Sequence, residues 1–248
     1  MSQPIQAIIL AGGKGTRLAP LTDHLPKPLV PIRGKAMILY VLEHLKAAGV
    51  TNVAISVAHL GDMIVDTLGD GSSMGMHFVY LREPEPMGTA GWTQLVDRSA
   101  LADEVLVLNA DNLFWIDVPA FLDRHRSTGA IATMAGVEIP SSTMSGAELL
   151  RPDEKKERLL DYIDRTMSRP YLDAEPSVYI SSGWYVFSPK ASVYIPQQSP
   201  ISMEKDVWPL LVKSGKPLGF YGATEPWFDS GTHERLAQID AFLASRGL

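Results

Sequence analysis

The feature that most constrains the fold is a short apolar run that ends in a glycine-rich turn near the start of the chain. Residues 7–10 read A-I-I-L, and A-G-G-K-G follows at once over residues 11–15. A compact apolar run of this kind is typical of a strand buried on both faces of a mostly parallel sheet. Open α/β sheets bind ligands at the carboxyl ends of such strands, so the turn is expected to face a ligand.

Helical and strand patterns alternate along the rest of the chain. Strands are expected over residues 53–57, 77–81, 105–108, 130–137, 159–163, 179–187 and 218–221, and helices over 38–45, 62–68, from Thr89, from Asp117 and over 232–245. This order predicts an α/β fold with a doubly wound, mostly parallel mixed sheet of the Rossmann-like type. We expect one domain over residues 1–248.

Two features modify this simple alternation. Prolines and charged residues interrupt the pattern from Glu138 to Glu157, which predicts an excursion over the active site around residues 138–176. No hexapeptide repeat is present, so we expect no β-helix domain at the carboxyl end.

Composition excludes several classes of function. The 248 residues are 46% hydrophobic, carry a net charge of −6 and include no cysteine. A soluble globular protein is expected, and the acidic balance without basic runs argues against nucleic acid or a membrane as partner. Disulfides, thiolate metal sites and cysteine nucleophiles are excluded. Because no leader or membrane anchor is indicated, a cytoplasmic location is expected.

The glycine turn has the chemistry of an anion site. Gly12, Gly13 and Gly15 can adopt positive φ angles and have no Cβ to hold a ligand away, so successive N–H groups can converge on phosphate oxygens or a base edge. Arg17 adds a fixed charge with fork geometry. Neither the P-loop pattern nor the dinucleotide fingerprint G-x-G-x-x-G fits this spacing.

A second cation follows in a stiff segment. Pro26 and Pro28 flank Lys27 and restrict the backbone, which predicts that no helix forms there and that one ammonium is presented from a rigid loop. Such a lysine is suited to an anion. An ordinary surface loop after a structural turn would be the alternative explanation.

Two aspartates follow predicted strands and suit a metal ion. Asp111 comes after the apolar residues 105–108, and Asp229 lies between Trp227-Phe228 and Ser230-Gly231. Carboxylate oxygens are the hard ligands that Mg²⁺ takes when it also holds substrate phosphates. An aspartate that caps a turn would explain either residue taken alone.

These motifs resemble the sugar nucleotidyltransferases, which join a sugar 1-phosphate to a nucleoside triphosphate and release pyrophosphate. The resemblance rests on residues 11–32 (A-G-G-K-G-T-R-L-A-P-L-T-D-H-L-P-K-P-L-V-P-I), 83–91 (E-P-E-P-M-G-T-A-G), 108–111 (L-N-A-D), 202–209 (S-M-E-K-D-V-W-P) and 227–232 (W-F-D-S-G-T). The mannose- and heptose-1-phosphate guanylyltransferases are the most similar branches. A homodimer is left open, since such enzymes often self-associate.

The resemblance implies a role for each part of the site. Catalytic residues would be Arg17, Lys27 and Asp111, with Mg²⁺ held by Asp111 and Asp229. The nucleotide would contact Leu10, Ala11, Gly12, Gly13, Gly15, Thr16, Glu83, Pro86, Gly88 and Thr89. The sugar 1-phosphate would contact Asn109, Gly146, Asp164, Arg165, Ser182 and Gly183.

Glu83 bears on the choice of base. Related enzymes that use uracil or thymine often have glutamine at this position. Two carboxylate oxygens suit guanine, which presents its N1–H and its amino group, so Glu83 favours GTP. A solvated acidic side chain is the alternative.

The sugar-side residues depart from the family pattern. Asp164-Arg165 stands where the family has Glu-Lys, Ser181-Ser182-Gly183 where it has Asn-Ala-Gly, and Ala110 where it has glycine. These changes leave the sugar open. Gly146 and Glu148 either line the sugar pocket or belong to an ordinary loop. Glu204, Lys205 and Asp206 are expected on a helix with Val207, Leu210 and Leu211, where they face solvent or hold neighbouring loops.

The reaction needs no general base. A sugar phosphate has a second pKa of about 6, so it is largely dianionic at neutral pH and can attack the α-phosphorus directly. Alternatives are a uridylyl-, cytidylyl- or adenylyltransferase acting on another sugar or cyclitol phosphate, and a regulatory nucleotide-binding homologue. A glycosyltransferase of related fold would be expected to show Asp-x-Asp where this chain has Asn109-Ala110-Asp111.

Overall fold

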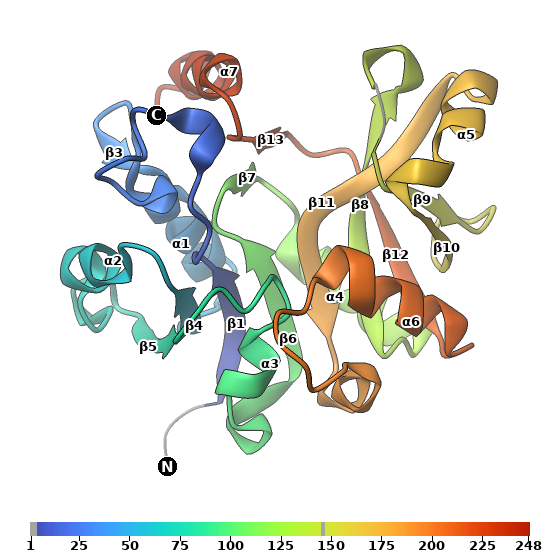
Figure 1. Ribbon diagram of the computed structural model, residues 1–248, viewed down its shortest axis with the longest axis horizontal. Coiled ribbons are helices and arrows are strands. Elements are labelled where there is room, and N and C mark those ends of the chain that lie inside the picture. The colour runs from blue at the N-terminus through green and yellow to red at the C-terminus, as the bar shows by residue number, and fades with distance from the viewer. Residues whose placement is uncertain (1–3, 145–146) are drawn as a thin grey trace. The chain divides into compact units, whose positions relative to one another are not determined.

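The computed structural model describes residues 4–144 and 147–248, which form two compact units (Figure 1). The first unit contains the residues up to Pro86 together with Leu108–Trp115 and Pro226–Leu248, and the second contains Met87–Val107 and Ile116–Glu225. The predicted α/β class with a large mixed, mostly parallel sheet is confirmed. The single catalytic domain over residues 1–248 stays a prediction.

Parallel strands form the centre of the first unit. β1 (Ile5–Leu10) pairs with β4 (Asn52–Val57), and β4 pairs with β5 (His77–Arg82), so that Ile9 faces Ile55 and Ile55 faces Tyr80. The carboxyl end of β6 (Leu101–Asn109) lies on the other side of β1. All these strands therefore end at one edge of the sheet, as the sequence predicts.

Helices and two small ladders complete the first unit. The helices are α1 (Met37–Ala47), α2 (Gly61–Leu68) and α7 (His233–Ser245), with short 3₁₀ turns at η1 (Thr16–Leu18), η2 (Lys27–Leu29) and η3 (Ser72–Met74). β2 (Pro31–Ile32) pairs with β3 (Lys35–Ala36), and β7 (Asn112–Phe114) pairs with β13 (Trp227–Asp229). One buried cluster joins β2, α1, β7 and α7, since Ile32, Met37, Leu113, Ile239 and Leu243 pack together.

The second unit is built around the long strand β11 (Ser177–Phe187). It is antiparallel to β8 (Ala132–Pro140) and to β9 (Leu149–Pro152), and it neighbours β6. β12 (Leu218–Ala223) runs parallel to β8, and β10 (Leu159–Ile163) is antiparallel to β9. The register against β8 shifts between Ser181 and Tyr185, so β11 carries an irregularity at the Ser181-Ser182-Gly183 segment.

The helices of the second unit are short except for one. They are α3 (Trp92–Leu95), α4 (Val118–Thr128), α5 (Arg169–Ala174) and α6 (Trp208–Lys213), together with η4 (Arg98–Ala100), η5 (Ser141–Thr143), η6 (Arg165–Met167), η7 (Pro189–Tyr194) and η8 (Met203–Val207). Asp117 caps α4 by accepting the Ala120 N–H at 2.9 Å, as the sequence predicts.

Two helix predictions need correction in this unit. The helix expected from Thr89 begins at Trp92, because residues 87–91 form a turn that is hydrogen-bonded to Ile201. Residues 203–207 form a π-helical turn, and the regular α-helix begins only at Trp208. The excursion around residues 138–176 contains β9, β10 and α5. Among the described helices, none has both the length and the apolar character that a bilayer crossing requires.

Candidate active site

The glycine turn leaves β1 beside the end of β4. The Ala11 N–H donates to the Ser56 carbonyl at 2.9 Å, which ties the start of the turn to the sheet. Gly15 has φ +63°, and a Cβ there would lie 3.0 Å from the Lys27 Cβ, so both conformation and space require glycine. A Cβ on Gly13 would meet nothing within 4 Å. The backbone at Gly13 is therefore open to a ligand.

Glu83 lies directly against this turn. Its backbone N–H donates to the Val57 carbonyl at 2.9 Å, and its Oε1 accepts the Ser56 hydroxyl at 2.8 Å. A Cβ on Gly12 would lie 2.9 Å from the same oxygen. Glu83 is thus half-buried and oriented by Ser56, not a freely solvated side chain.

Lys27 and Asp111 form an ion pair next to Gly15. Lys27 is 6% exposed, and its Nζ lies 2.6 Å from Asp111 Oδ2. The prediction that no helix forms here is wrong, since residues 27–29 make one 3₁₀ turn. Pro28 is compatible with that turn because the first turn of a helix does not require its missing N–H.

The two predicted metal ligands occupy neighbouring backbone positions. Asp229 pairs with Asn112 in the β13–β7 ladder, directly beside Asp111. The Ser230 N–H and hydroxyl both donate to the Asp111 carbonyl, at 3.1 and 2.6 Å. The ladder therefore brings together two aspartates that lie far apart in the sequence.

Asp229 has cationic neighbours of its own. Its Oδ1 accepts the Gly231 N–H at 2.7 Å, and its Oδ2 pairs with Arg235 in the first turn of α7. A Cβ on Gly231 would lie 2.8 Å from Arg17 Nη2 and 2.8 Å from Asp229 Oδ1, so Arg17 reaches the same place. Sequence patterns gave no signal for Arg235, because only the turn after β13 directs it back to Asp229.

The remaining predicted contacts of the first unit lie along the same sheet edge or near it. Leu10 ends β1, Ala11 follows it, Thr16 begins η1, Asn109 ends β6, and Pro86 is exposed at the end of the first segment of the unit. The first unit thus gathers most of the predicted triphosphate contacts and both predicted metal ligands.

The donor set suits a magnesium ion that arrives with phosphate. Among the described residues no group of three or more histidine, aspartate or glutamate side chains forms a self-sufficient metal site. Mg²⁺ usually takes only one or two carboxylates and completes its shell with water and substrate phosphates. Asp111 and Asp229 fit that requirement. In the protein without ligand, Lys27 balances the charge of Asp111 and Arg235 balances the charge of Asp229.

The family model for nucleotidyl transferases matches residues 6–246. The chain belongs to the nucleotidyl transferase family. It is 32% identical over 246 residues to a mannose-1-phosphate guanylyltransferase of Mycobacterium tuberculosis, covering 98% of this chain and 66% of that protein. It is also 29% identical over 238 residues to a UTP–glucose-1-phosphate uridylyltransferase of Synechocystis, covering 92% and 60%. The chain therefore spans between 60% and 66% of the length of these two relatives.

Solved structures show the same fold in this nucleotidyl transferase. HddC from Yersinia pseudotuberculosis, in a crystal structure with GMP-PN, superposes with a TM-score of 0.78 at 23% identity, covering 96% of this chain and 99% of that one. A second crystal structure of HddC gives a TM-score of 0.77 at 25% identity, with the same coverage.

The second unit of the nucleotidyl transferase carries four of the predicted sugar contacts, namely Asp164, Arg165, Ser182 and Gly183. Asp164 is exposed and caps η6, accepting the Thr166 N–H at 2.9 Å and the Thr166 hydroxyl at 2.6 Å. These hydrogen bonds, that of the hydroxyl first, lower the pKa of Asp164. Arg165 follows within η6 and is exposed. A structural capping role therefore exists beside the predicted sugar role.

The other sugar-side residues lie on β11. Ser182 is fully buried, and its hydroxyl oxygen accepts the Trp184 N–H at 3.2 Å. Gly183 has φ +77°, and its N–H donates to the Ser181 hydroxyl oxygen at 3.2 Å. Gly146, also predicted to contact sugar, lies outside the described residues. Gly88 and Thr89 belong to the turn before α3.

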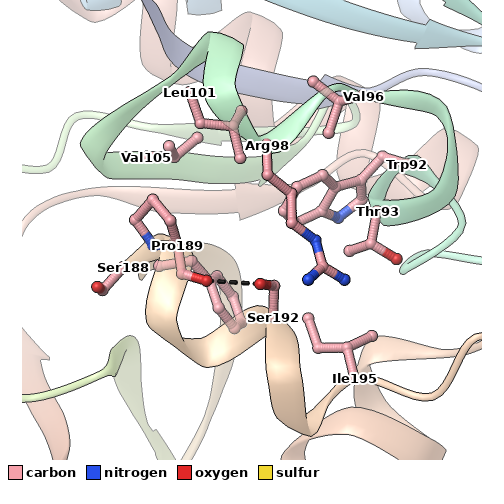
Figure 2. Close-up of a pocket in the computed structure, with 11 residues that line it drawn as sticks. Trp92, Thr93, Val96, Arg98, Leu101, Val105, Ser188, Pro189, Ser192 and Ile195 are labelled. Atoms are coloured by element: carbon pink, nitrogen blue, oxygen red, sulfur yellow. Dashed lines mark hydrogen bonds between the residues drawn. The ribbon is translucent and has the colours of Figure 1, made fainter.

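A separate pocket in the second unit contains none of the predicted site residues. Figure 2 shows it lined mainly by apolar side chains such as Trp92, Val96 and Ile195, with Arg98 and Ser192 at its polar side. The Ser192 hydroxyl is already used, since it donates to the Pro189 carbonyl at 2.5 Å.

Proposed function

We propose that this chain transfers GMP from GTP to a hexose or heptose 1-phosphate and releases pyrophosphate. One observation carries the proposal: Lys27 and Asp111, separated by 84 positions, meet at 2.6 Å beside the glycine turn. A nearly buried lysine needs a negative partner, and a pair of this kind beside a glycine turn is suited to meet a charged ligand. Both named relatives transfer a nucleotidyl group to a sugar 1-phosphate, which supports the reaction class.

The chemistry follows from phosphate electrostatics. A phosphate oxygen of the sugar 1-phosphate attacks the α-phosphorus of the triphosphate, a new P–O bond forms, and the bond to the β-phosphate breaks. The glycine turn would bind the triphosphate through its N–H groups, and Arg17 and Lys27 would stabilise the charge on the departing pyrophosphate. Asp111 and Asp229 would hold Mg²⁺, which supplies further neutralisation of the phosphate charge when bound.

Glu83 supports guanine as the base. Its Oε1 is fixed by Ser56 at 2.8 Å next to Gly12, so the carboxylate is held in one orientation at the turn. A fixed carboxylate accepts the paired donors of guanine, whereas uracil offers only one donor on its pairing edge. The GMP-PN in the HddC crystal structure and the guanylyltransferase among the relatives point the same way.

Sugar recognition is assigned mainly to residues of the second unit. Asp164, Arg165, Ser182 and Gly183, with Asn109 at the end of β6, are the proposed contacts with the sugar 1-phosphate. An arginine binds phosphate through its fork of donors, so Arg165 is suited to the sugar phosphate. Self-association and a cytoplasmic location stay predictions.

The test is pyrophosphate release from the four ribonucleoside triphosphates, each with a panel of hexose and heptose 1-phosphates and Mg²⁺. We expect GTP with one of the hexose or heptose 1-phosphates to give the highest kcat/KM. Release with UTP exceeding release with GTP would refute the base assignment. No release with any pair would refute the transferase function, and retained triphosphate binding would then favour the regulatory alternative.

A further inference from the structure

A tight turn in the second unit is bound to the segment that precedes the π-helical turn η8. The Ile201 N–H donates to the Met87 carbonyl at 2.8 Å, and the Ala90 N–H donates to the Ile201 carbonyl at 2.9 Å. Gly88 has φ +80°, and a Cβ there would lie 2.3 Å from the Ile201 carbonyl oxygen. The turn at residues 87–91 is therefore fixed by backbone contacts that admit only glycine at its centre.

The hydroxyl of Thr89 makes two hydrogen bonds within this arrangement. It donates to Glu204 Oε2 at 2.8 Å and accepts the Met203 N–H at 2.8 Å. A hydroxyl with its donor and one acceptor position engaged has little capacity left for a ligand. The turn can therefore meet a nucleotide through its backbone but not through the donor of Thr89.

Glu204 is the centre of a cluster of hydroxyl groups. Its Oε2 also accepts the Ser202 hydroxyl at 2.8 Å, and the buried Tyr185 hydroxyl bonds both Glu204 and Ser181, the latter at 3.1 Å. Burial, followed by the charge of Glu204, raises the pKa of Tyr185, so the phenol stays protonated and can donate. In the described part of the chain, Glu204 forms no ion pair.

The backbone around Glu204 is itself unusual. Residues 203–207 form a π-helical turn in which the Asp206 and Val207 N–H groups both donate to the Ser202 carbonyl, each at 3.1 Å. The Ser202 hydroxyl oxygen accepts the Glu204 and Lys205 N–H groups at 3.2 Å, and the Ser202 N–H donates to Asp206 Oδ2 at 2.7 Å. π-helical turns are rare and are found frequently at functional sites. This one directs the Glu204 carboxylate at Thr89.

We propose that Glu204 is a positioning residue that holds the Gly88-Thr89 turn in the conformation in which its backbone meets the nucleotide. The inference rests on the proposed function, because that function makes the turn a nucleotide contact. It assigns Glu204 a role through Thr89 and no contact with the reacting atoms.

The experiment compares variants that differ in one hydroxyl. Thr89→Val removes the group that joins the turn to Glu204 and keeps the shape of the side chain, whereas Thr89→Ser retains the hydroxyl. Thr93→Val is the matched control, because the Thr93 hydroxyl is buried nearby and donates only to the Ala90 carbonyl at 2.8 Å. Glu204→Gln replaces one carboxylate oxygen, an acceptor for the Thr89 hydroxyl, by an amide group. The measurements are amide hydrogen exchange at Ala90 and Met203 in the unliganded protein, the dissociation constant of GTP, the KM of the sugar phosphate and the melting temperature.

The proposal predicts a specific pattern. Thr89→Val and Glu204→Gln should speed exchange at Ala90 and Met203 and weaken GTP binding by about tenfold, with the sugar phosphate KM unchanged. Thr89→Ser should behave as the wild type. Thr93→Val should lower the melting temperature without weakening GTP binding.

Two results would overturn the proposal. One is unchanged exchange at Ala90 and Met203 in Thr89→Val. The other is faster exchange in Thr89→Val with an unchanged dissociation constant of GTP, when the wild type itself binds GTP. If the wild type binds no triphosphate, the proposed function fails, and the positioning role toward the nucleotide fails with it. In that case, faster exchange in Thr89→Val would show only that the hydrogen bond between Thr89 and Glu204 stabilises the turn.

Discussion

Lys27 places a positive charge in the interior of the first unit, where it forms an ion pair with one carboxylate. The ammonium is nearly buried, and Asp111 is its ion-pair partner at 2.6 Å, with the Asp111 side chain still 34% exposed. An unpaired charge at such a depth would be costly, so the pair must stay together or be replaced by other charges. Under the proposed function, a bound triphosphate and its metal ion would provide such charges.

The first prediction concerns Asp111→Asn. The amide oxygen can still accept a hydrogen bond from Lys27, so we expect a loss of about 2 kcal/mol in the free energy of unfolding. Removing a carboxylate that would hold the metal should lower kcat on the order of 100-fold or more. Urea denaturation and pyrophosphate release check both effects. Wild-type turnover in this variant would remove Asp111 from the metal site.

The second prediction concerns the base. Glu83→Gln replaces one acceptor oxygen by a donor, which should lower the ratio of kcat/KM for GTP over UTP by about tenfold, equivalent to about 1.4 kcal/mol. Glu85→Gln is the control, because Glu85 is an exposed acidic residue in the same turn. An unchanged nucleotide profile in Glu83→Gln, or an equal change in Glu85→Gln, would contradict the assignment.

At the level of elements, the turns that position the site are more constrained than the helices around them. The turn at Gly88 and the helix end at Gly129 both have positive φ angles, +80° and +61°. Only Gly88 approaches another backbone closely, since a Cβ on Gly129 would meet nothing within 4 Å. The same substitution should therefore have different consequences in the two elements.

The third prediction uses this contrast. Gly129→Ala should cost about 1 kcal/mol of unfolding free energy, the penalty for a left-handed residue with a Cβ. Gly88→Ala adds a collision with the Ile201 backbone and should cost about 3 kcal/mol or more. Chemical denaturation of the two variants measures the difference. Equal losses would mean that the turn at residues 87–91 relaxes freely.

The fourth prediction concerns pH and the contact between α4 and β8. His125 is buried on α4, and its Nδ1 lies 2.7 Å from the Thr133 hydroxyl on β8. Burial, more than any neighbouring charge, lowers the pKa of His125 below its ordinary value of 6.5. The folded state therefore favours the neutral ring, and this stabilisation is complete above about pH 6.5 and is lost as the pH falls toward the lower folded pKa.

The check is the unfolding free energy of wild type and His125→Gln at pH 8 and pH 5.5. Wild type should lose more stability than the variant, by up to about 1.4 kcal/mol per pH unit. The variant is less stable at pH 8, but its pH dependence should be smaller. Parallel curves for the two proteins would show that His125 does not titrate on unfolding.

At the level of the whole molecule, the net charge of −6 opposes binding of polyanionic substrates. Under the proposed function, binding of a triphosphate would depend on local cations such as Arg17 and Lys27, and on a metal ion, more than on the overall field. The fifth prediction follows from linkage. GTP with Mg²⁺ at 100 times its dissociation constant should stabilise the protein by about 2.7 kcal/mol.

Thermal unfolding measures this effect, with UTP and with Asp111→Asn as comparisons. We expect a larger rise in melting temperature for GTP than for UTP at equal concentration, and a reduced rise in the variant. An equal rise for both nucleotides would indicate that the protein does not distinguish the bases in binding.

Much of the fold was predictable because its signals are local. The apolar periodicity of β1, β4, β5, α1 and α7 follows from neighbouring residues and needs no knowledge of partners. Predictions were wrong where distant contacts override local preference. Residues 87–91 form a turn that is hydrogen-bonded to Ile201, so the helix expected from Thr89 begins only at Trp92. The turn at residues 27–29 is a different case, because its hydrogen bonds are local and a proline is compatible with the first turn of a helix.

The sequence by itself determined the α/β class, the glycine turn and the candidate residues Arg17, Lys27, Asp111 and Asp229, because each lies in a short motif with its own chemistry. Only the tertiary structure decided which of these side chains meet. The Lys27–Asp111 pair and the Thr89–Glu204 hydrogen bond depend on strand register and on turns, which join residues 84 and 115 positions apart. Local spacing carries no information about such pairings, since the order of strands in a sheet is set by packing of the whole chain.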